Sequence, residues 1–230
     1  MTTEPIEQDS RGALSKLALK FVVDPYSSKS FAYRARARRW DMLSARFPDL
    51  DAMRVLDLGG RPVVWTSAPV RPKQVVTVNY ERHESPEDWI TAVQGDACDL
   101  PAEVRNDRFD LVYSNSVIEH VGGHDRCLRF CESVHALADA HWVQTPWRYF
   151  PLEPHWICPG LQFLPLPLRA SVARVWPIGC YREESREDPV GAVLSVQLLS
   201  VAEMRRYFPK STLLYERVAG VLKSIIAVQG

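Results

Sequence analysis

The sequence has no excess of charge of either sign, because its 28 lysines and arginines are matched by 28 aspartates and glutamates. A protein that binds nucleic acid along an extended surface needs a positive footprint, so this balance argues against that class. The sequence also has no apolar run of about 20 residues, the length that a membrane-spanning helix requires. Its first ten residues, MTTEPIEQDS, are polar and acidic, unlike a secretory signal.

Cysteine is scarce too. The five cysteines are odd in number, and no two of them have the CxxC spacing of metal and redox sites. Cys127 and Cys131 are one helical turn apart, but no further ligand lies near them in the sequence. His120 and His124 have the same spacing, yet the two glycines between them interrupt the helix that a metal pair would need. We therefore expect no metal site, five free thiols and a reducing compartment, the cytoplasm.

The chain of 230 residues is long enough for one domain with a full hydrophobic core. Apolar residues recur at helical spacing between residues 33 and 47, which predicts a helix near the N-terminus. The arginines of this helix form either a solvated face or a contact with an anionic substrate or membrane surface. They stand at positions 34, 36, 38, 39 and 46.

The rest of the chain alternates between apolar segments and helical patterns. The expected strands are residues 53–58, 74–80, 89–96, 109–116, 141–146, 211–220 and 222–230. Helical patterns cover residues 124–138 and 200–208. This alternation predicts an α/β fold with a doubly wound, mostly parallel sheet. The last two strands are too close in sequence for a helical crossover, so we expect an antiparallel pair at the C-terminus.

Residues 146–189 interrupt this alternation. Eight of the 17 prolines and three of the seven tryptophans fall in this segment. It is too apolar for a flexible linker and too rich in proline for regular structure. We expect an ordered, irregular insertion that covers one edge of the sheet.

Small and polar residues follow four of the expected strands. In chain order they are Asp57 with Gly59 and Gly60, Asn79 with Tyr80, Asp96 with Ala97 and Cys98, and Ser114 with Asn115. In an open α/β sheet, ligands bind beyond the carboxyl ends of the strands, near the switch in strand order. These residues are therefore expected to gather at one ligand site.

The segments VLDLGG, VTVNYE, QGDACDLP and FDLVYSNSVIEHV, in this order and spacing, resemble the class I S-adenosylmethionine-dependent methyltransferases. Within that family, the chain is similar to the small-molecule group related to the ubiquinone and menaquinone biosynthesis methyltransferases. The resemblance implies a Rossmann-like sheet of seven strands in a domain over residues 51–230. It also implies an N-terminal helical segment over residues 1–50 that covers the cofactor site. The cofactor is then S-adenosylmethionine, and the product is S-adenosylhomocysteine.

The same resemblance implies roles for the first two strand ends. Gly59 and Gly60 pass beside the methionyl part of the cofactor, because glycine has no Cβ, and Asp57 orients its ammonium group. Asn79 and Tyr80 bind the ribose. Two departures from the family pattern occur here: Arg-Pro replaces a third glycine, and Asn79 replaces an acid. An asparagine still bonds a ribose hydroxyl, but without charge assistance.

For the next two strand ends, the resemblance implies contacts with the adenine and with the methionyl side. Asp96 accepts a hydrogen bond from the adenine amino group, and Ala97 and Cys98 pack or bond beside it. Ser114 and Asn115 line the methionyl side of the cofactor.

Methyl transfer needs an aligned acceptor and, for a hydroxyl or an acidic carbon, a base. Glu119 and His120 follow the fourth strand, and His120 suits this role because its unperturbed pKa lies near neutrality. The alternative is that both order the loop by hydrogen bonds. Residues after the fifth strand either wall an acceptor pocket or pack the insertion on the sheet. They are Trp147, Arg148, Tyr149 and His155.

The proline motif of enzymes that methylate amino groups of nucleic acids is absent after the fourth strand, where this chain reads SNSV. We therefore expect a small, partly apolar acceptor, O- or C-methylation, and a monomer or homodimer. A second hypothesis is a binding module or partner subunit with weak catalysis. A third, a nicotinamide-dependent oxidoreductase, needs G-x-G-x-x-G after the first strand, and GGRPVV lacks it.

Overall fold

The computed structural model describes the backbone of residues 31–230. The earlier part of the expected N-terminal segment 1–50 lies outside the described residues. The described chain falls into two compact units. The larger holds Trp40–Pro151 and Val193–Gly230, and the smaller holds Leu152–Ala192 with the described residues before Trp40. Within the described part, no helix is long and apolar enough to cross a membrane.

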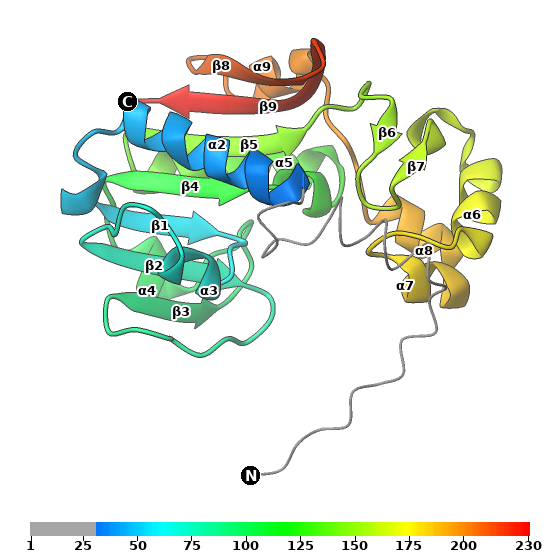
Figure 1. Cartoon of the computed structure of the whole chain (residues 1–230). Coiled ribbons are helices and arrows are strands. Elements are labelled where there is room, and N and C mark those ends of the chain that lie inside the picture. The colour runs from blue at the N-terminus through cyan, green and yellow to red at the C-terminus, as the bar shows by residue number, and fades with distance from the viewer. Residues whose placement is uncertain (1–30) are drawn as a thin grey trace. The chain divides into compact units, whose positions relative to one another are not determined.

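The larger unit contains one sheet of seven strands, with the order β3-β2-β1-β4-β5-β9-β8 (Figure 1). The strands are β1 (Arg54–Leu58), β2 (Gln74–Asn79), β3 (Ile90–Gln94), β4 (Leu111–Asn115), β5 (Ala140–Pro146), β8 (Thr212–Val218) and β9 (Val221–Gln229). The first five run parallel, and β9 is antiparallel to both β5 and β8. This confirms the predicted α/β fold, including the antiparallel pair at the C-terminus.

The central strands are buried on both faces, which explains why they read as continuous apolar runs. On one face pack α2 (Phe31–Arg46) and α3 (Val63–Thr66), through Trp40, Leu43 and Trp65. On the other face pack α4 (Ala102–Arg105), α5 (Gly123–Leu137) and α9 (Val201–Tyr207). Figure 1 shows α2 and α3 in front of the sheet and α5 behind it.

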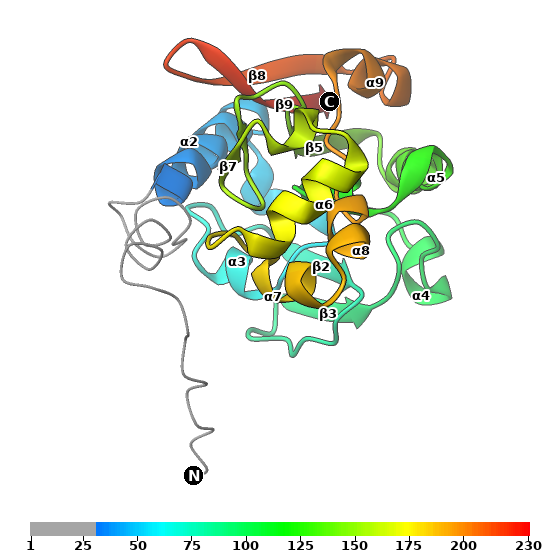
Figure 2. The same cartoon turned by 90° about the vertical axis from the view of Figure 1, so that its right-hand side faces the viewer.

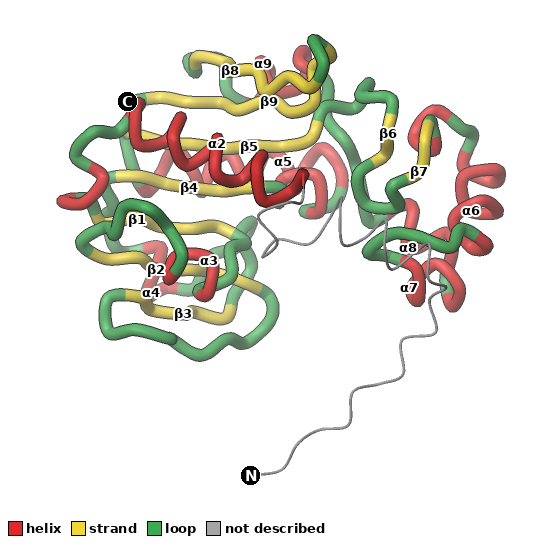
Figure 3. The backbone as a smooth tube through the Cα atoms, viewed as in Figure 1, coloured by secondary structure: helices red, strands yellow, loops and turns green. Residues whose placement is uncertain are grey.

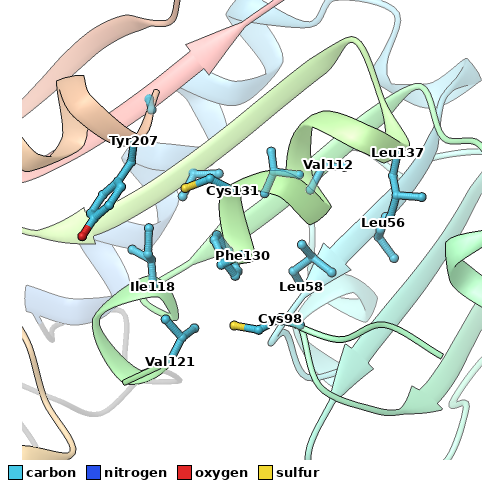
Figure 4. Close-up of a cluster of buried hydrophobic side chains, with 14 of the residues drawn as sticks. Leu56, Leu58, Cys98, Val112, Ile118, Val121, Phe130, Cys131, Leu137 and Tyr207 are labelled. Atoms are coloured by element: carbon cyan, nitrogen blue, oxygen red, sulfur yellow. The ribbon is translucent and has the colours of Figure 1, made fainter. Parts of the chain in front are cut away.

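The core behind the sheet fixes the loops that carry polar residues. Phe130 and Cys131 of α5 face Leu58 and other strand side chains, and Tyr207 of α9 completes the cluster (Figure 4). Ile118, in the loop after β4, is anchored in the same cluster and is 1% exposed. All five cysteines are free thiols, and only Cys180 is exposed.

The smaller unit is mostly helical (Figures 2 and 3). Between Leu152 and Ala192 its elements are β6 (Leu152–Glu153), β7 (Cys158–Pro159), η3 (Leu161–Phe163), α6 (Leu166–Val175), α7 (Arg182–Glu187) and the start of α8 (Pro189–Leu194). The part of α2 before Trp40 also belongs to it. The expectation that proline prevents regular structure here is wrong. Pro165 precedes α6 and Pro167 lies in its first turn, where the missing N–H groups have no helical partner in any case. That this segment covers an edge of the sheet stays a prediction.

Candidate functional site

The strand order places β1 between β2 and β4, so the chain leaves β1 at the switch point of the sheet. The turn after β1 needs glycine twice. Gly59 has a φ of +78°, and a Cβ there would lie 2.5 Å from the side chain of Val117. A Cβ on Gly60 would lie 1.7 Å from the Asp57 carboxylate. The turn thus brings bare backbone against both neighbours, and the single-turn helix α3 follows at Val63.

The Asp57 carboxylate lies beneath this turn and is 2% exposed. The indole N–H of Trp65 donates to its Oδ2 at 2.7 Å. Its Oδ1 is buried and has no hydrogen-bond partner among the described residues. Burial raises the pKa of Asp57 to about 7, even though the Trp65 bond opposes this shift. The site therefore holds a buried carboxyl group with one unused acceptor oxygen, which suits a cationic ligand group.

Asn79, at the end of β2, is engaged with the same turn. Its side-chain N–H₂ donates to the carbonyl oxygens of Gly59 and Gly60 at 3.0 and 3.2 Å. Its Oδ1 accepts from the backbone N–H of Glu81 at 3.0 Å. An ionised carboxylate has no hydrogen to donate to a carbonyl oxygen, so the asparagine makes two bonds here that the family's usual carboxylate cannot make. It holds the glycine turn against the end of β2.

Asp96, after β3, is held by an arginine from α5. Nη2 of Arg126 donates to both carboxylate oxygens of Asp96 at 2.8 Å, and the Cys98 amide donates to Oδ1 at 2.8 Å. Burial alone would raise the pKa of Asp96, but these hydrogen bonds outweigh it and hold the pKa below its usual range. Nη2 of Arg126 also contacts the Tyr80 hydroxyl, and Nε donates to the Val121 carbonyl. Arg126 thus links the ends of β2 and β3 to the loop after β4.

Sequence reasoning missed Arg126. A signal for it exists, because Arg126 lies in the first turn of α5, where the helix dipole favours acids over cations. A cation at such a position calls for a nearby acid, and the acids that end neighbouring strands are the candidates. Ser116, Val117 and Val121 were also missed, and Ser116 stands out only in the structure, where its φ is +57°.

We expect Arg126→Gln to weaken binding of S-adenosylhomocysteine, the product that the sequence resemblance implies, about five- to tenfold, because the Asp96 carboxylate loses the group that fixes its direction. Isothermal titration calorimetry measures this directly. Arg129→Gln, an exposed arginine one turn further along α5, is the matched control and should bind like the wild type. Unchanged or tighter binding by Arg126→Gln would contradict the inference that Arg126 orients the Asp96 carboxylate for the ligand.

The loop after β4 contributes His120 and Glu119, both in η2 (Ile118–His120). The two side chains differ in burial, since His120 is half-buried and Glu119 is fully buried. The Thr145 hydroxyl donates to Oε2 of Glu119 at 2.9 Å. Ser116 donates to Oε1 of Gln144, whose Nε2 is buried without a hydrogen-bond partner among the described residues.

These strand ends surround one cavity. Its lining residues are Gly59, Val78, Asn79, Tyr80, Gly95, Asp96, Ala97, Ser116, Val117, His120 and Val121. Six of the residues singled out from the sequence meet there: Gly59, Asn79, Tyr80, Asp96, Ala97 and His120. Asp57 and Gly60 lie at the turn beside it, as described above.

Other predicted site residues are not part of the lining. Ser114 is buried, and its hydroxyl donates to the Leu58 carbonyl at 2.9 Å, which ties β4 to β1. Cys98 is also buried and donates its thiol to the Arg126 carbonyl. Asn115 pairs with Gln144 in the β4–β5 ladder. Glu119 is buried beside Thr145 rather than at the cavity wall.

The residues after β5 are placed by backbone pairing. Trp147 bridges to Leu199 and packs on the core behind the sheet. Arg148 donates to the Leu198 carbonyl and to Glu203 Oε1, each at 2.8 Å. Tyr149 is 50% exposed and meets Trp147 edge to face at 5.5 Å.

His155 lies in the smaller unit and is oriented by a buried acid. Nδ1 of His155 lies 2.7 Å from Oε1 of Glu153, which is 2% exposed. Oε2 of Glu153 accepts from the backbone N–H groups of His155 and Trp156 at 2.8 Å. A carboxylate on Nδ1 favours the tautomer in which Nε2 can accept a proton. The pair is thus built to hold one imidazole in one orientation.

The cavity can be tested against cofactors by its charges. Its described lining includes one carboxylate, that of Asp96, and no lysine or arginine. A dinucleotide with its pyrophosphate would meet no side-chain cation in this lining and would face an acid. An adenosyl group linked to an amino acid fits better. In the lining, the Asp96 carboxylate offers an acceptor for an amino group; the unused Oδ1 of Asp57 is a second acceptor, buried under the turn beside the cavity.

The fold and this cavity define an α/β protein with a small cavity at the carboxyl ends of its parallel strands. A family model described as "Methyltransferase domain" matches residues 31–151, more than half of the chain. The protein belongs to this methyltransferase family. No curated protein matches its sequence significantly.

Solved structures agree on the fold. The chain is similar to a protein from Listeria monocytogenes provisionally assigned as an S-adenosylmethionine dependent methyltransferase, with 14% identity, a TM-score of 0.53, and 84% and 97% of the two chains covered. The N-terminal domain of EvdMO1 with SAH bound has 17% identity, a TM-score of 0.50, and 84% and 79% covered. A provisionally assigned Zn-dependent alcohol dehydrogenase from Rhodobacter sphaeroides has 12% identity, a TM-score of 0.56, and 83% and 87% covered. Identities this low show a shared fold and carry no reaction from one protein to another.

Proposed function

We propose that this methyltransferase uses S-adenosylmethionine to methylate a hydroxyl or an acidic carbon of a small, partly apolar molecule. The observation that carries the proposal is the cavity at the ends of β1–β4. It gathers a glycine turn, a polar β2 end, an acid after β3 and an imidazole after β4. Membership of the methyltransferase family supports the same reaction class.

In this proposal, Asp57 receives the ammonium group of the cofactor on its unused oxygen, while Gly59 and Gly60 allow close approach of the methionyl part. Tyr80 and Asn79 bind the ribose, Asn79 through the lone pair left on its Oδ1. The adenine amino group bonds the Asp96 carboxylate, beside Ala97. Cys98, Ser114 and Asn115 support these contacts from behind the lining, because the first two are buried and tied to backbone carbonyls.

The bound cofactor supplies an activated methyl group on its sulfonium. The protein must then orient the acceptor and take its proton. We assign the role of proton acceptor to His120, which lines the cavity. Glu119 fixes the loop through its hydrogen bond with Thr145. Trp147, Arg148 and Tyr149 contact the acceptor. Aromatic surface with a few fixed polar groups suits a partly apolar molecule.

Thermal unfolding with and without S-adenosylhomocysteine tests the proposal. A ligand at about 100 times its dissociation constant stabilises the folded state by roughly 2.7 kcal/mol. For a domain of this size, the midpoint should rise by about 5–10 °C. NAD serves as the control and should produce no shift. A shift with NAD and none with S-adenosylhomocysteine would contradict the proposal.

A second candidate, a binding module with weak catalysis, is favoured by the hydrogen bonds that two cavity residues already make within the protein. The side-chain N–H₂ of Asn79 is committed to the glycine turn, and the Asp96 carboxylate is already paired with Arg126. In a binding module, both ligands would leave the unfolding midpoint unchanged. Saturable binding of S-adenosylhomocysteine would exclude this candidate.

A further inference from the structure

The smaller unit carries an unusual surface run of apolar residues. Residues 163–168 read FLPLPL, and every one of the six is exposed. The exposed fractions are 54% for Phe163, 37% for Leu164, 36% for Leu166 and 56% for Leu168. Single exposed apolar side chains are common, whereas a continuous run of this length marks a binding surface. We call residues 163–168 the apolar tip.

The backbone of the apolar tip also suits an apolar medium. The first N–H groups of a helix lack helical partners and are usually satisfied by water or by a polar cap. At the start of α6 the capping position is Pro165, and no side chain caps the helix. Pro165 and Pro167 have no N–H groups, and the N–H groups of Phe163 and Leu164 are bonded to Gly160 and Leu161. Few unsatisfied donors therefore remain to resist leaving water.

The charged residues near the apolar tip indicate which kind of partner it binds. Between Glu153 and Glu183 the sequence contains three arginines and no acid. Of these three, Arg174 is exposed on the same helix as the tip, whereas Arg169, which directly follows the tip, is half-buried. Arginines beside exposed leucines and phenylalanine are typical of segments that insert into the headgroup region of anionic lipids. Helix α7 follows and carries three glutamates with two arginines; its first acid, Glu183, lies 3.6 Å from guanidinium nitrogens of Arg182 and Arg186, so Arg174 is the exposed cation on which the charge argument rests.

We propose that the apolar tip docks this protein on anionic lipid bilayers, with its leucines and phenylalanine in the interfacial region and the neighbouring Arg174 at the headgroups. Six residues do not span a bilayer, so the contact is peripheral and reversible. A protein held this way works where a partly apolar acceptor is concentrated. The docking itself does not depend on methyl transfer.

Vesicle flotation of the full chain without cofactor tests the proposal. Vesicles of phosphatidylcholine with 30% phosphatidylglycerol are compared with vesicles of phosphatidylcholine alone. We expect binding to the anionic vesicles that weakens as salt is added, because charge contributes to it. The variant Phe163→Ser/Leu168→Ser should reduce binding at least tenfold. Arg174→Glu should reduce it about fivefold on anionic vesicles.

The matched control is Tyr215→Ser/Val221→Ser, which removes two exposed apolar side chains from the β8–β9 hairpin, where they are 38% and 42% exposed. This variant should bind like the wild type. Equal loss of binding in both double variants would overturn the proposal. A wild-type protein that does not bind the anionic vesicles would overturn it as well. Sedimentation velocity without lipid tests whether the apolar tip instead binds a second copy of the protein. If the wild type is a dimer and Phe163→Ser/Leu168→Ser is a monomer, the tip is a subunit interface, and lipid docking is overturned.

Discussion

Asp57→Asn is expected to remove a pH dependence of stability and to weaken cofactor binding at least tenfold at pH 7.5. The Asp57 carboxyl titrates near 3.8 in the unfolded chain and near 7 when folded. Between these values the folded state keeps a proton that the unfolded state has lost, so stability falls as pH rises from about 4 to about 7. The loss attributable to Asp57 is on the order of 4 kcal/mol. Asparagine cannot titrate, so the variant should not show it.

Denaturant unfolding of both proteins between pH 4.5 and 8 measures this effect. The difference in unfolding free energy between variant and wild type isolates Asp57, because all other titrating groups are shared. It should shift in favour of the variant as pH rises. A difference that stays constant over this range would show that the Asp57 carboxyl titrates normally in the folded protein.

Cofactor affinity should change with pH in the opposite direction to the stability of the folded state. Only the ionised carboxylate attracts an ammonium group, so wild-type affinity for S-adenosylhomocysteine should rise as pH increases from 5.5 to 7.5. In Asp57→Asn the affinity should be at least tenfold lower at pH 7.5 and nearly flat with pH, since a charged hydrogen bond contributes about 1.5–3 kcal/mol. Calorimetry at several pH values checks both statements. Equal affinities would remove Asp57 from the binding site.

Gly60→Ala should both destabilise the protein and impair binding. The backbone of Gly60 does not have a positive φ, so alanine fits its conformation. The added methyl group would instead overlap the Asp57 carboxylate, which is held by Trp65. Moving that carboxylate breaks its one hydrogen bond and strains a packed core, at a cost of about 2–4 kcal/mol. Binding of S-adenosylhomocysteine should fall more than tenfold.

A double variant separates the clash from other effects. In Asp57→Ala/Gly60→Ala the carboxylate is gone, so the new methyl group has room. Unfolding free energies of the two single variants and the double variant form a cycle, in which we expect about 1–2 kcal/mol of favourable coupling. Additive losses would mean that Gly60 is required for a reason other than contact with Asp57.

The fold was predictable because the central strands read as continuous apolar runs, the pattern that burial on both faces of a sheet produces. The apolar runs that end at Leu58, Asn79 and Asn115 are buried on both faces, and short loops fix the antiparallel β8–β9 pair. The interior of the 146–189 segment was not predictable from composition. Proline there was taken as a breaker, whereas Pro165 and Pro167 stand where α6 begins and break nothing.

The candidate site was predictable in location but not in bonding. The rule that ligands bind at strand ends brought Asn79, Asp96 and His120 to one cavity. It could not show that Asn79 is bonded to two glycine carbonyls or that Asp96 is paired with Arg126. Those bonds join residues 19 to 30 positions apart in the chain. They depend on side-chain directions that no periodicity encodes.

The strand order also bears on how the protein is made. Strand β5 ends at Pro146, and the strand that pairs with its outer edge, β9, begins only at Val221. Roughly 75 residues, including the Leu152–Ala192 part of the smaller unit, are therefore synthesised while that edge is open. At roughly 5–20 residues per second, the edge stays unpaired on the ribosome for several seconds. During that time β5 is a template for pairing with other nascent chains. Chaperone supply and translation speed, more than the stability of the finished fold, should then govern the yield of native protein.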